Sequence, residues 1–165
     1  MIVRASLLLL LLSSTNLAIA QSKELQLVGQ AHLKVLFWSV YHSRLYSPDG
    51  DYQLGERPLR LEIEYLMNIA AEDLVQRTAD EWRAQQRTHQ RQNQWLQSLA
   101  QIWPDVSSND VISLELGTDN RSVFFRNGEP LGTIDDPLFG QYFLDIWLSP
   151  DTTRPKLRRQ LLGQR

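Results

Sequence analysis

Two tyrosines and a lysine stand out as groups that could do chemistry within residues 28–50. Tyr41 and Tyr46 are five positions apart, and Lys34 precedes them. A phenol can donate a hydrogen bond to a polarised or anionic oxygen, and its ring also suits the wall of an apolar ligand site. The stretch therefore has two interpretations, the wall of a cleft or one strand of an ordinary core. We favour the scaffold role for both tyrosines and keep the cleft role as the alternative.

The other reactive side chains give no pattern that completes a catalytic or metal site. His32, His42 and His89 lack helical pairing with one another and lack a carboxylate at ligand spacing. Asp135–Asp136 precede Pro137, which is more typical of a helix cap than of a catalytic pair. The chain has no cysteine. We therefore expect no metal, no cofactor and no catalytic residue that spacing alone can assign.

Alternating apolar and polar residues predict the strands that would position these groups. Residues 25–37 alternate, residues 40–46 can return as a second strand, and residues 59–65 alternate again. Three further strands are expected at 111–116, 122–126 and 130–134, joined by tight turns. The five tryptophans are interpreted as core residues.

Helical spacing predicts the remaining elements. A single helix over residues 70–103 would be about 50 Å long, which exceeds a domain of this size, so a break is expected near Thr88. Asn68 is expected to cap the first helix, and Asp136 with Pro137 is expected to begin the next one. A short basic helix should start at Pro155. These elements predict an α+β domain, with an antiparallel sheet and helices on one face.

Residues 1–20 have the features of a secretory signal peptide. Arg4 supplies a positive charge, leucines fill positions 7–12, and Ala18 and Ala20 stand before the expected cleavage at Gln21. We predict a single domain over residues 21–165, located in the periplasm. The leucine run is far below the ~20 residues of a membrane span, so no transmembrane segment is expected. A net charge of −2 argues against nucleic acid as a partner.

Residues 25–163 resemble the chalcone isomerase family. The order Gly29, Tyr41 and Tyr46 is similar to the strand pair of that family and its bacterial relatives. "AEDLVQRTADEW" resembles its first helix, and "LGTIDDPLFGQYFLDIWLS" followed by "PKLRRQLLG" resembles its closing helices. The resemblance implies an open-faced β-sandwich, in which helices layer on one face of a large antiparallel sheet and a ligand cleft lies between them.

The resemblance does not carry the isomerase activity with it. Aligned motif by motif, the family's strand arginine falls at Leu33 and its threonine at Tyr41. The family's helix tyrosine and asparagine fall at Ala70 and Arg77, and its late threonine falls at Ile146. Lys34 would point to the opposite face from Leu33 and is no simple substitute for the arginine. All five positions depart from the family pattern, so we favour a non-catalytic protein.

Non-catalytic members of the fold hold fatty acids, which implies an apolar or anionic amphiphilic ligand here. The resemblance places four residues in that ligand site: Leu33, Tyr41, Arg77 and Ile146. Two alternatives stay open: a periplasmic structural or protein-interaction domain without a ligand, and an isomerase (intramolecular lyase) with rearranged residues. The sequence identifies neither the ligand nor a protein partner.

Overall fold

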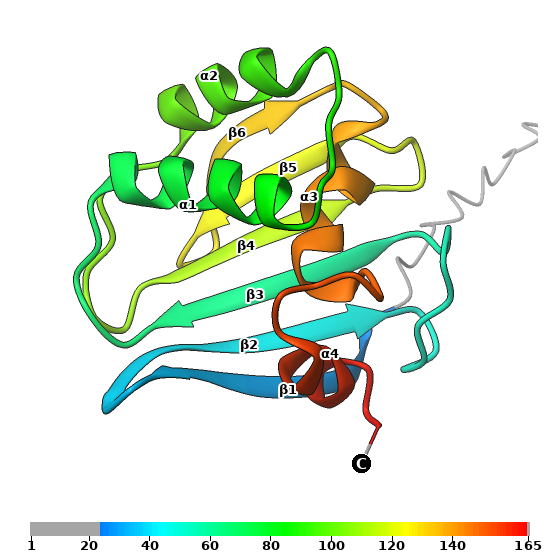
Figure 1. The fold of residues 1–165 in the computed structure, drawn as a ribbon. Coiled ribbons are helices and arrows are strands. Elements are labelled where there is room, and N and C mark those ends of the chain that lie inside the picture. Colours follow the sequence, from blue (N-terminus) through cyan, green and yellow to red (C-terminus); the bar gives the residue numbers. More distant parts are fainter. Residues whose placement is uncertain (1–23, 165) are drawn as a thin grey trace, which may run out of the picture.

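A computed structural model describes residues 24–164 as one antiparallel sheet backed by helices (Figure 1). The six strands pair in sequence order, each with its neighbour along the chain. They are β1 (Gln26–Val35), β2 (Trp38–Ser47), β3 (Leu59–Tyr65), β4 (Val111–Leu116), β5 (Ser122–Arg126) and β6 (Glu129–Ile134). The α+β class and the helix-backed antiparallel sheet predicted from the sequence are confirmed. The predicted signal peptide lies outside the described residues.

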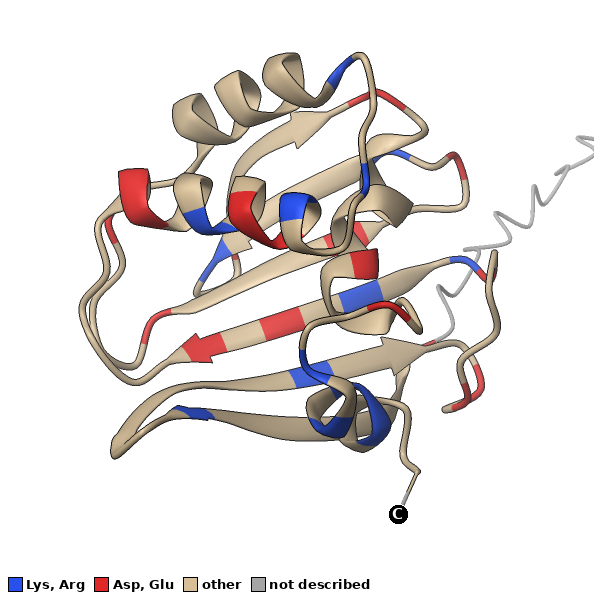
Figure 2. Ribbon diagram, viewed as in Figure 1, with Lys and Arg blue, Asp and Glu red and all other residues tan. Residues whose placement is uncertain are grey.

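Strict alternation in β3 shows how the sheet acquires two different faces. Leu61 and Ile63 are buried toward the helices, whereas Arg60, Glu62 and Glu64 lie on the other face. That outer face carries ion pairs from Arg60 to Glu62 and from Arg44 to Glu64, so charged residues colour the strands in Figure 2. One face is thus apolar and covered, and the other is polar and open.

The helices are α1 (Ala71–Ala84), α2 (Gln92–Ile102), α3 (Phe139–Leu148) and α4 (Pro155–Leu161), all on the apolar face of the sheet (Figure 1). The break expected near Thr88 is present, since α1 ends at Ala84 and α2 begins at Gln92. Gln86 in this connection has a φ of 53°, which no α-helix can contain.

Both predicted helix caps are wrong in detail. The Asn68 amide oxygen accepts a hydrogen bond from the backbone of Ser108, while the N–H of Ala71 is satisfied by Asp105 from another loop. Asp136 accepts from the N–H of Leu138 in a turn, and α3 begins only at Phe139. In each case the side chain bonds to a backbone N–H of a turn or loop outside the helix that it was expected to cap.

Aromatic side chains fill the space between the sheet and helices α1, α2 and α3. Trp82, Trp95, Phe124 and Phe139 are almost fully buried and contact one another edge to face, an arrangement that aromatic rings prefer. The interpretation of every tryptophan as core is wrong for Trp38, which is 71% exposed.

The last helix returns to the first strand. A Cβ on Gly29 of β1 would lie 2.6 Å from the carbonyl oxygen of Leu161 and 2.7 Å from the nitrogen of Gly163. Only glycine allows the backbone of α4 to approach so closely. No helix within residues 24–164 is long and apolar enough to cross a membrane.

Candidate ligand cavity

A cavity of about 380 Å³ lies between the sheet and the helices. This volume falls within the ~300–1,000 Å³ of small-molecule sites. Strand residues make one wall, α1 and α3 make the other, and the connection from α3 to α4 borders it. Most lining residues are apolar, among them Leu33, Val40, Leu61, Ile63, Ile69, Leu74, Ile112, Leu114, Phe124, Phe143 and Ile146.

All four residues that the sequence analysis assigned to a ligand site line this cavity. Leu33 of β1 and Tyr41 of β2 are direct cross-strand partners. Arg77 comes from α1 and Ile146 from α3, so the sheet and two helices contribute to this site. Lys34 does not line the cavity. This agrees with the expectation that Lys34 and its neighbour Leu33 point to opposite faces of the sheet. That these four side chains bind a ligand stays a prediction.

Tyr41 is held in place inside the cavity from two sides. Its hydroxyl accepts a hydrogen bond of 2.9 Å from the indole Nε1 of Trp147, and its ring meets Tyr65 edge to face with centroids 6.2 Å apart. Burial raises the pKa of Tyr41 to about 12, and burial also raises the pKa of Tyr65. Tyr41 is therefore neutral at physiological pH, and its hydroxyl hydrogen can still be donated.

Tyr46 lies in β2, as the scaffold interpretation expected, but its side chain is neither in the buried core nor in the cavity wall. Its hydroxyl donates to Glu62 over 3.1 Å, and the guanidinium of Arg60 lies 5.4 Å from its ring centroid. These partners belong to the outer face of the sheet. Strand alternation explains the difference, because an interval of five residues puts two side chains on opposite faces.

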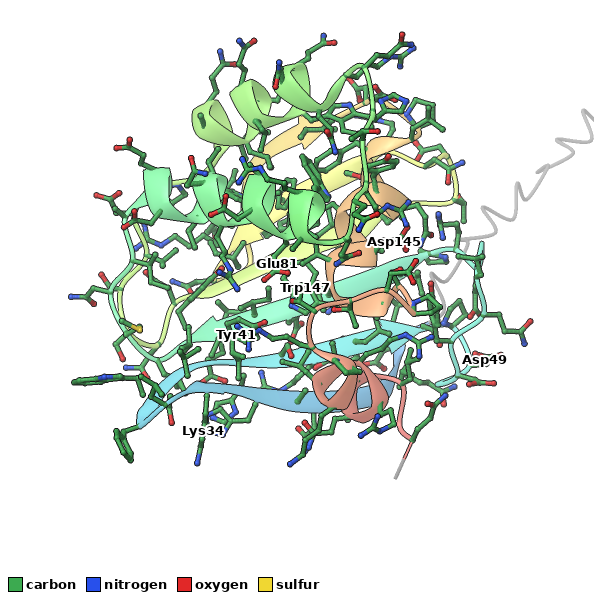
Figure 3. All side chains as sticks on the ribbon, viewed as in Figure 1. Lys34, Tyr41, Asp49, Glu81, Asp145 and Trp147 are labelled. Carbon is green, nitrogen blue, oxygen red and sulfur yellow. The ribbon has the colours of Figure 1, made fainter. Side chains whose placement is uncertain are left out.

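Charged residues gather at one side of the cavity, on α1 and on the connection from α3 to α4. Arg77 contacts Glu81 over 2.6 Å, and the second oxygen of Glu81 accepts from the hydroxyl of Thr153 over 2.7 Å. Six residues line a smaller surface hollow. Asp80 and Ala84 line this hollow alone, whereas Arg77, Glu81, Thr153 and Arg154 also line the large cavity. We call these four residues the polar mouth; Figure 3 labels Glu81 near Trp147 and Tyr41.

A family model described as chalcone isomerase-like matches residues 13–163. The chain belongs to the chalcone isomerase-like family. An uncharacterized protein of Haemophilus influenzae is 32% identical over 139 residues, which are 84% of this chain and 68% of that protein. The crystal structure of a fatty-acid binding protein of Arabidopsis thaliana has a TM-score of 0.65 at 12% identity, covering 84% of this chain and 86% of that one. This likeness shows the shared fold.

The chalcone isomerase-like alignment made from the sequence can be compared with the cavity position by position. Leu33, Tyr41, Arg77 and Ile146 stand where it expected cleft positions, and all line the cavity. Ala70 does not; it is the residue before α1, and its neighbour Ile69 lines the cavity instead. Within residues 24–164 no hydrogen bond joins an arginine to Tyr41, whose hydroxyl bonds to Trp147 instead.

Sequence reasoning missed several cavity residues of this family member. Arg154 and Thr153 follow the predicted end of α3, and nothing in their spacing shows that the connection folds back over the cavity. The sequence predicts Trp147 to be a core residue and gives Glu81 no role. Glu81 is only 7% exposed. A buried acid on a helix needs a partner, and Arg77 four residues earlier was the available signal.

The histidines do not form a metal site within the described residues, where no group of three or more His, Cys, Asp or Glu side chains is suitably placed. His32 and His42 face each other across β1 and β2, with ring centroids 4.3 Å apart. Burial lowers the pKa of His32, and the neighbouring His42 lowers it further. His89 stacks on Trp95 at the edge of the core.

Proposed function

We propose that this chalcone isomerase-like protein binds, without catalysis, a small amphiphile with an apolar tail and an anionic head, of fatty-acid type. The observation that carries the proposal is the combination of an apolar cavity with two arginines among its lining residues. The name of the Arabidopsis structural neighbour, a fatty-acid binding protein, supports the choice of ligand class.

The apolar walls suit the tail. Leu33, Ile63, Phe124 and Ile146 bring aliphatic and aromatic surface from four different elements to the cavity. Each buried methylene contributes about 0.8 kcal/mol, so a tail of several carbons gives appreciable affinity without any polar contact.

The polar mouth suits the head. A carboxylate removed from water needs a cation or hydrogen-bond donors, because an unpaired buried charge is heavily penalised. Arg77 is 59% exposed and its bond to Glu81 occupies one NH group, which leaves further donors of the guanidinium for a ligand. Arg154 supplies a second cation, and neutral Tyr41 supplies a hydroxyl.

The absence of catalysis is proposed from the residues that occupy the family positions. Ring closure onto an enone needs a cation that holds the phenolate nucleophile and donors that polarise the carbonyl. Leucine stands at the strand position, so no cation is supplied there to hold the nucleophile. Loss of one preorganised donor commonly costs about 10²–10³ in rate. Because all five family positions depart from the family pattern, chalcone cyclisation should proceed no faster with the protein than without it.

The test is titration of a fatty acid into the wild type and into matched variants. Arg77→Ala and Arg154→Ala should each weaken binding about ten- to a hundredfold, because a charge-assisted hydrogen bond contributes about 1.5–3 kcal/mol. Tyr41→Phe should lose less, since it removes a neutral donor. Arg83→Ala is the control: this arginine is on the same helix, bonds Asp80 and is 73% exposed.

The outcomes separate the parts of the proposal. Equal affinity in all variants would discard the head-group assignment while leaving the apolar cavity as the binding site. No binding to the wild type would overturn the ligand-binding function. Thermal melts of each variant check that the fold is intact.

We also propose that the protein is exported to the periplasm with cleavage before Gln21, on the strength of the charged, apolar and small-residue segments of residues 1–20. Cell fractionation and N-terminal sequencing test this. Protein that retains Met1 would refute the cleavage.

A further inference from the structure

The turn between β1 and β2 exposes four consecutive apolar residues. Val35 is 42% exposed, Leu36 87%, Phe37 99% and Trp38 71%. We call residues 35–38 the hairpin tip. It projects beyond the sheet with no helix over it (Figure 1). A run of this length on a surface is unfavourable for solubility unless it has a function.

The conformation of the turn adds to this argument. Val35 and Trp38 are paired, so Leu36 and Phe37 form a two-residue turn. Leu36 has a φ of 54°. Glycine, asparagine and aspartate are preferred at such positions, and a bulky side chain there is uncommon. Leucine therefore occupies a position where a polar turn residue would favour both folding and solubility.

The hairpin tip is continuous with the cavity wall. Val35 lines the cavity from β1, and Val40 lines it from β2, two residues beyond the tip. The backbone N–H of Leu66 bonds to the carbonyl of Val40, which brings the half-exposed Met67 segment beside the base of the hairpin. Apolar surface thus runs from inside the cavity to the most exposed side chains of this region.

We propose that the hairpin tip is a membrane-docking surface that inserts into the interfacial region of a lipid bilayer. A stable protein interface needs about 20–30 residues from each partner, far more than this narrow projection offers. Insertion into a bilayer interface needs only a few aromatic and aliphatic side chains, and tryptophan is enriched there. Lys34, exposed beside the tip and labelled in Figure 3, is placed to meet lipid phosphate.

The docking surface extends the proposed function, because a tip embedded in lipid would place the cavity next to a store of amphiphiles. The exchange of ligand with the bilayer rests on that function. The membrane contact itself does not, and it can be measured without any added fatty acid.

The experiment compares two double variants of protein purified from cells that express the full-length sequence. Phe37→Ser with Trp38→Ser, the tip variant, removes the two aromatic side chains of the hairpin tip. Leu54→Ser with Leu138→Ser removes two other exposed apolar residues, which are 79% and 51% exposed. Neither pair lines the cavity. Binding is measured by co-sedimentation with phosphatidylcholine vesicles containing phosphatidylglycerol.

The tip variant should bind these vesicles at least about tenfold more weakly than wild type, because two large apolar side chains no longer leave water. The control variant should bind as wild type does. Blue-shifted tryptophan emission on vesicle binding should disappear in Trp38→Ser, since Trp38 is the most exposed of the five tryptophans. Fatty-acid affinity measured without vesicles should be the same in all three proteins.

Three results would overturn the docking surface. The first is a wild type that fails to sediment with vesicles. The second is a control variant that loses as much binding as the tip variant. The third is a wild-type dimer, seen by sedimentation velocity, that the tip variant does not form. The last result would assign the tip to a second copy of the chain. The fatty-acid titration decides separately whether the cavity binds ligand.

Discussion

The indole of Trp147 donates a hydrogen bond of 2.9 Å to the hydroxyl of Tyr41, and so ties α3 to β2 across the cavity. The bond fixes the orientation of the phenol in an otherwise apolar space. It also gives the half-buried indole N–H its partner. Both consequences can be tested with one substitution.

Tyr41→Phe should lower the free energy of unfolding by about 1 kcal/mol, because the Trp147 N–H loses its acceptor while the ring packing stays. Urea denaturation measures the change. Tyr46→Phe is the control, since its hydroxyl bonds Glu62 on the open face and both groups can return to water. A Tyr41→Phe protein as stable as wild type would show that the bond contributes nothing.

Asp110 should make stability depend on acid pH. The guanidinium of Arg126, the N–H of Ser107 and the amide of Asn127 bond its carboxylate, and together they hold its pKa at about 2. Because this value is below the ordinary one of about 4, the stabilisation is present above pH ~4 and is lost as the pH falls through about 2.

The stability difference between wild type and Asp110→Asn should therefore shrink steadily between pH ~4 and ~2. Urea denaturation at a series of pH values measures it. Asp135→Asn serves for comparison, because that carboxylate is 77% exposed. A difference that stays constant over this pH range would contradict the assignment.

Gly29→Ala should destabilise the protein by about 1–3 kcal/mol, since the added Cβ would overlap the backbone of Leu161 and Gly163. Thermal unfolding measures the loss. Gln30→Ala, one residue on and exposed, should have little effect. Equal stability of the two variants would mean that α4 can move away from β1 without penalty.

Leu36→Asn should raise the free energy of unfolding by about 1 kcal/mol, because asparagine tolerates the left-handed backbone better than leucine. The same variant should bind vesicles less well than wild type. Leu54→Asn, in a loop without a positive φ at that residue, should give no such gain. A gain in stability together with unchanged vesicle binding would separate the turn from the docking surface.

The strands were predictable because burial of one sheet face leaves a period of two in the sequence, most clearly in β3. The β-bulges beside Gly29 and Leu33 were not predictable, because the pairing of β1 with β2 sets the register of these strands. The partner of the first N–H of α1 could not be predicted from local sequence patterns either, because Asp105 is 34 residues from Ala71.

Some residues of the candidate site could be predicted from the sequence, and others could not. Leu33, Tyr41, Arg77 and Ile146 came from family motifs, and they line one cavity. Arg154 and Thr153 were missed because the path of the connection from α3 to α4 depends on tertiary packing. Trp38 and Phe37 continued an apolar pattern, and only the position of the turn puts them in solvent.

The contact of α4 with Gly29 has a consequence for the order in which the protein can be completed. β1 is synthesised before α4, yet that helix covers its apolar face. Until α4 is available, the β1–β2 hairpin has an uncovered face, and a two-stranded hairpin is marginal in water. In a chain that stalls or is cut before Pro155, the apolar face of β1 therefore stays uncovered and can contact other proteins. A permuted chain that joins residue 164 to residue 24 and starts at an exposed loop elsewhere would make that contact local from the outset.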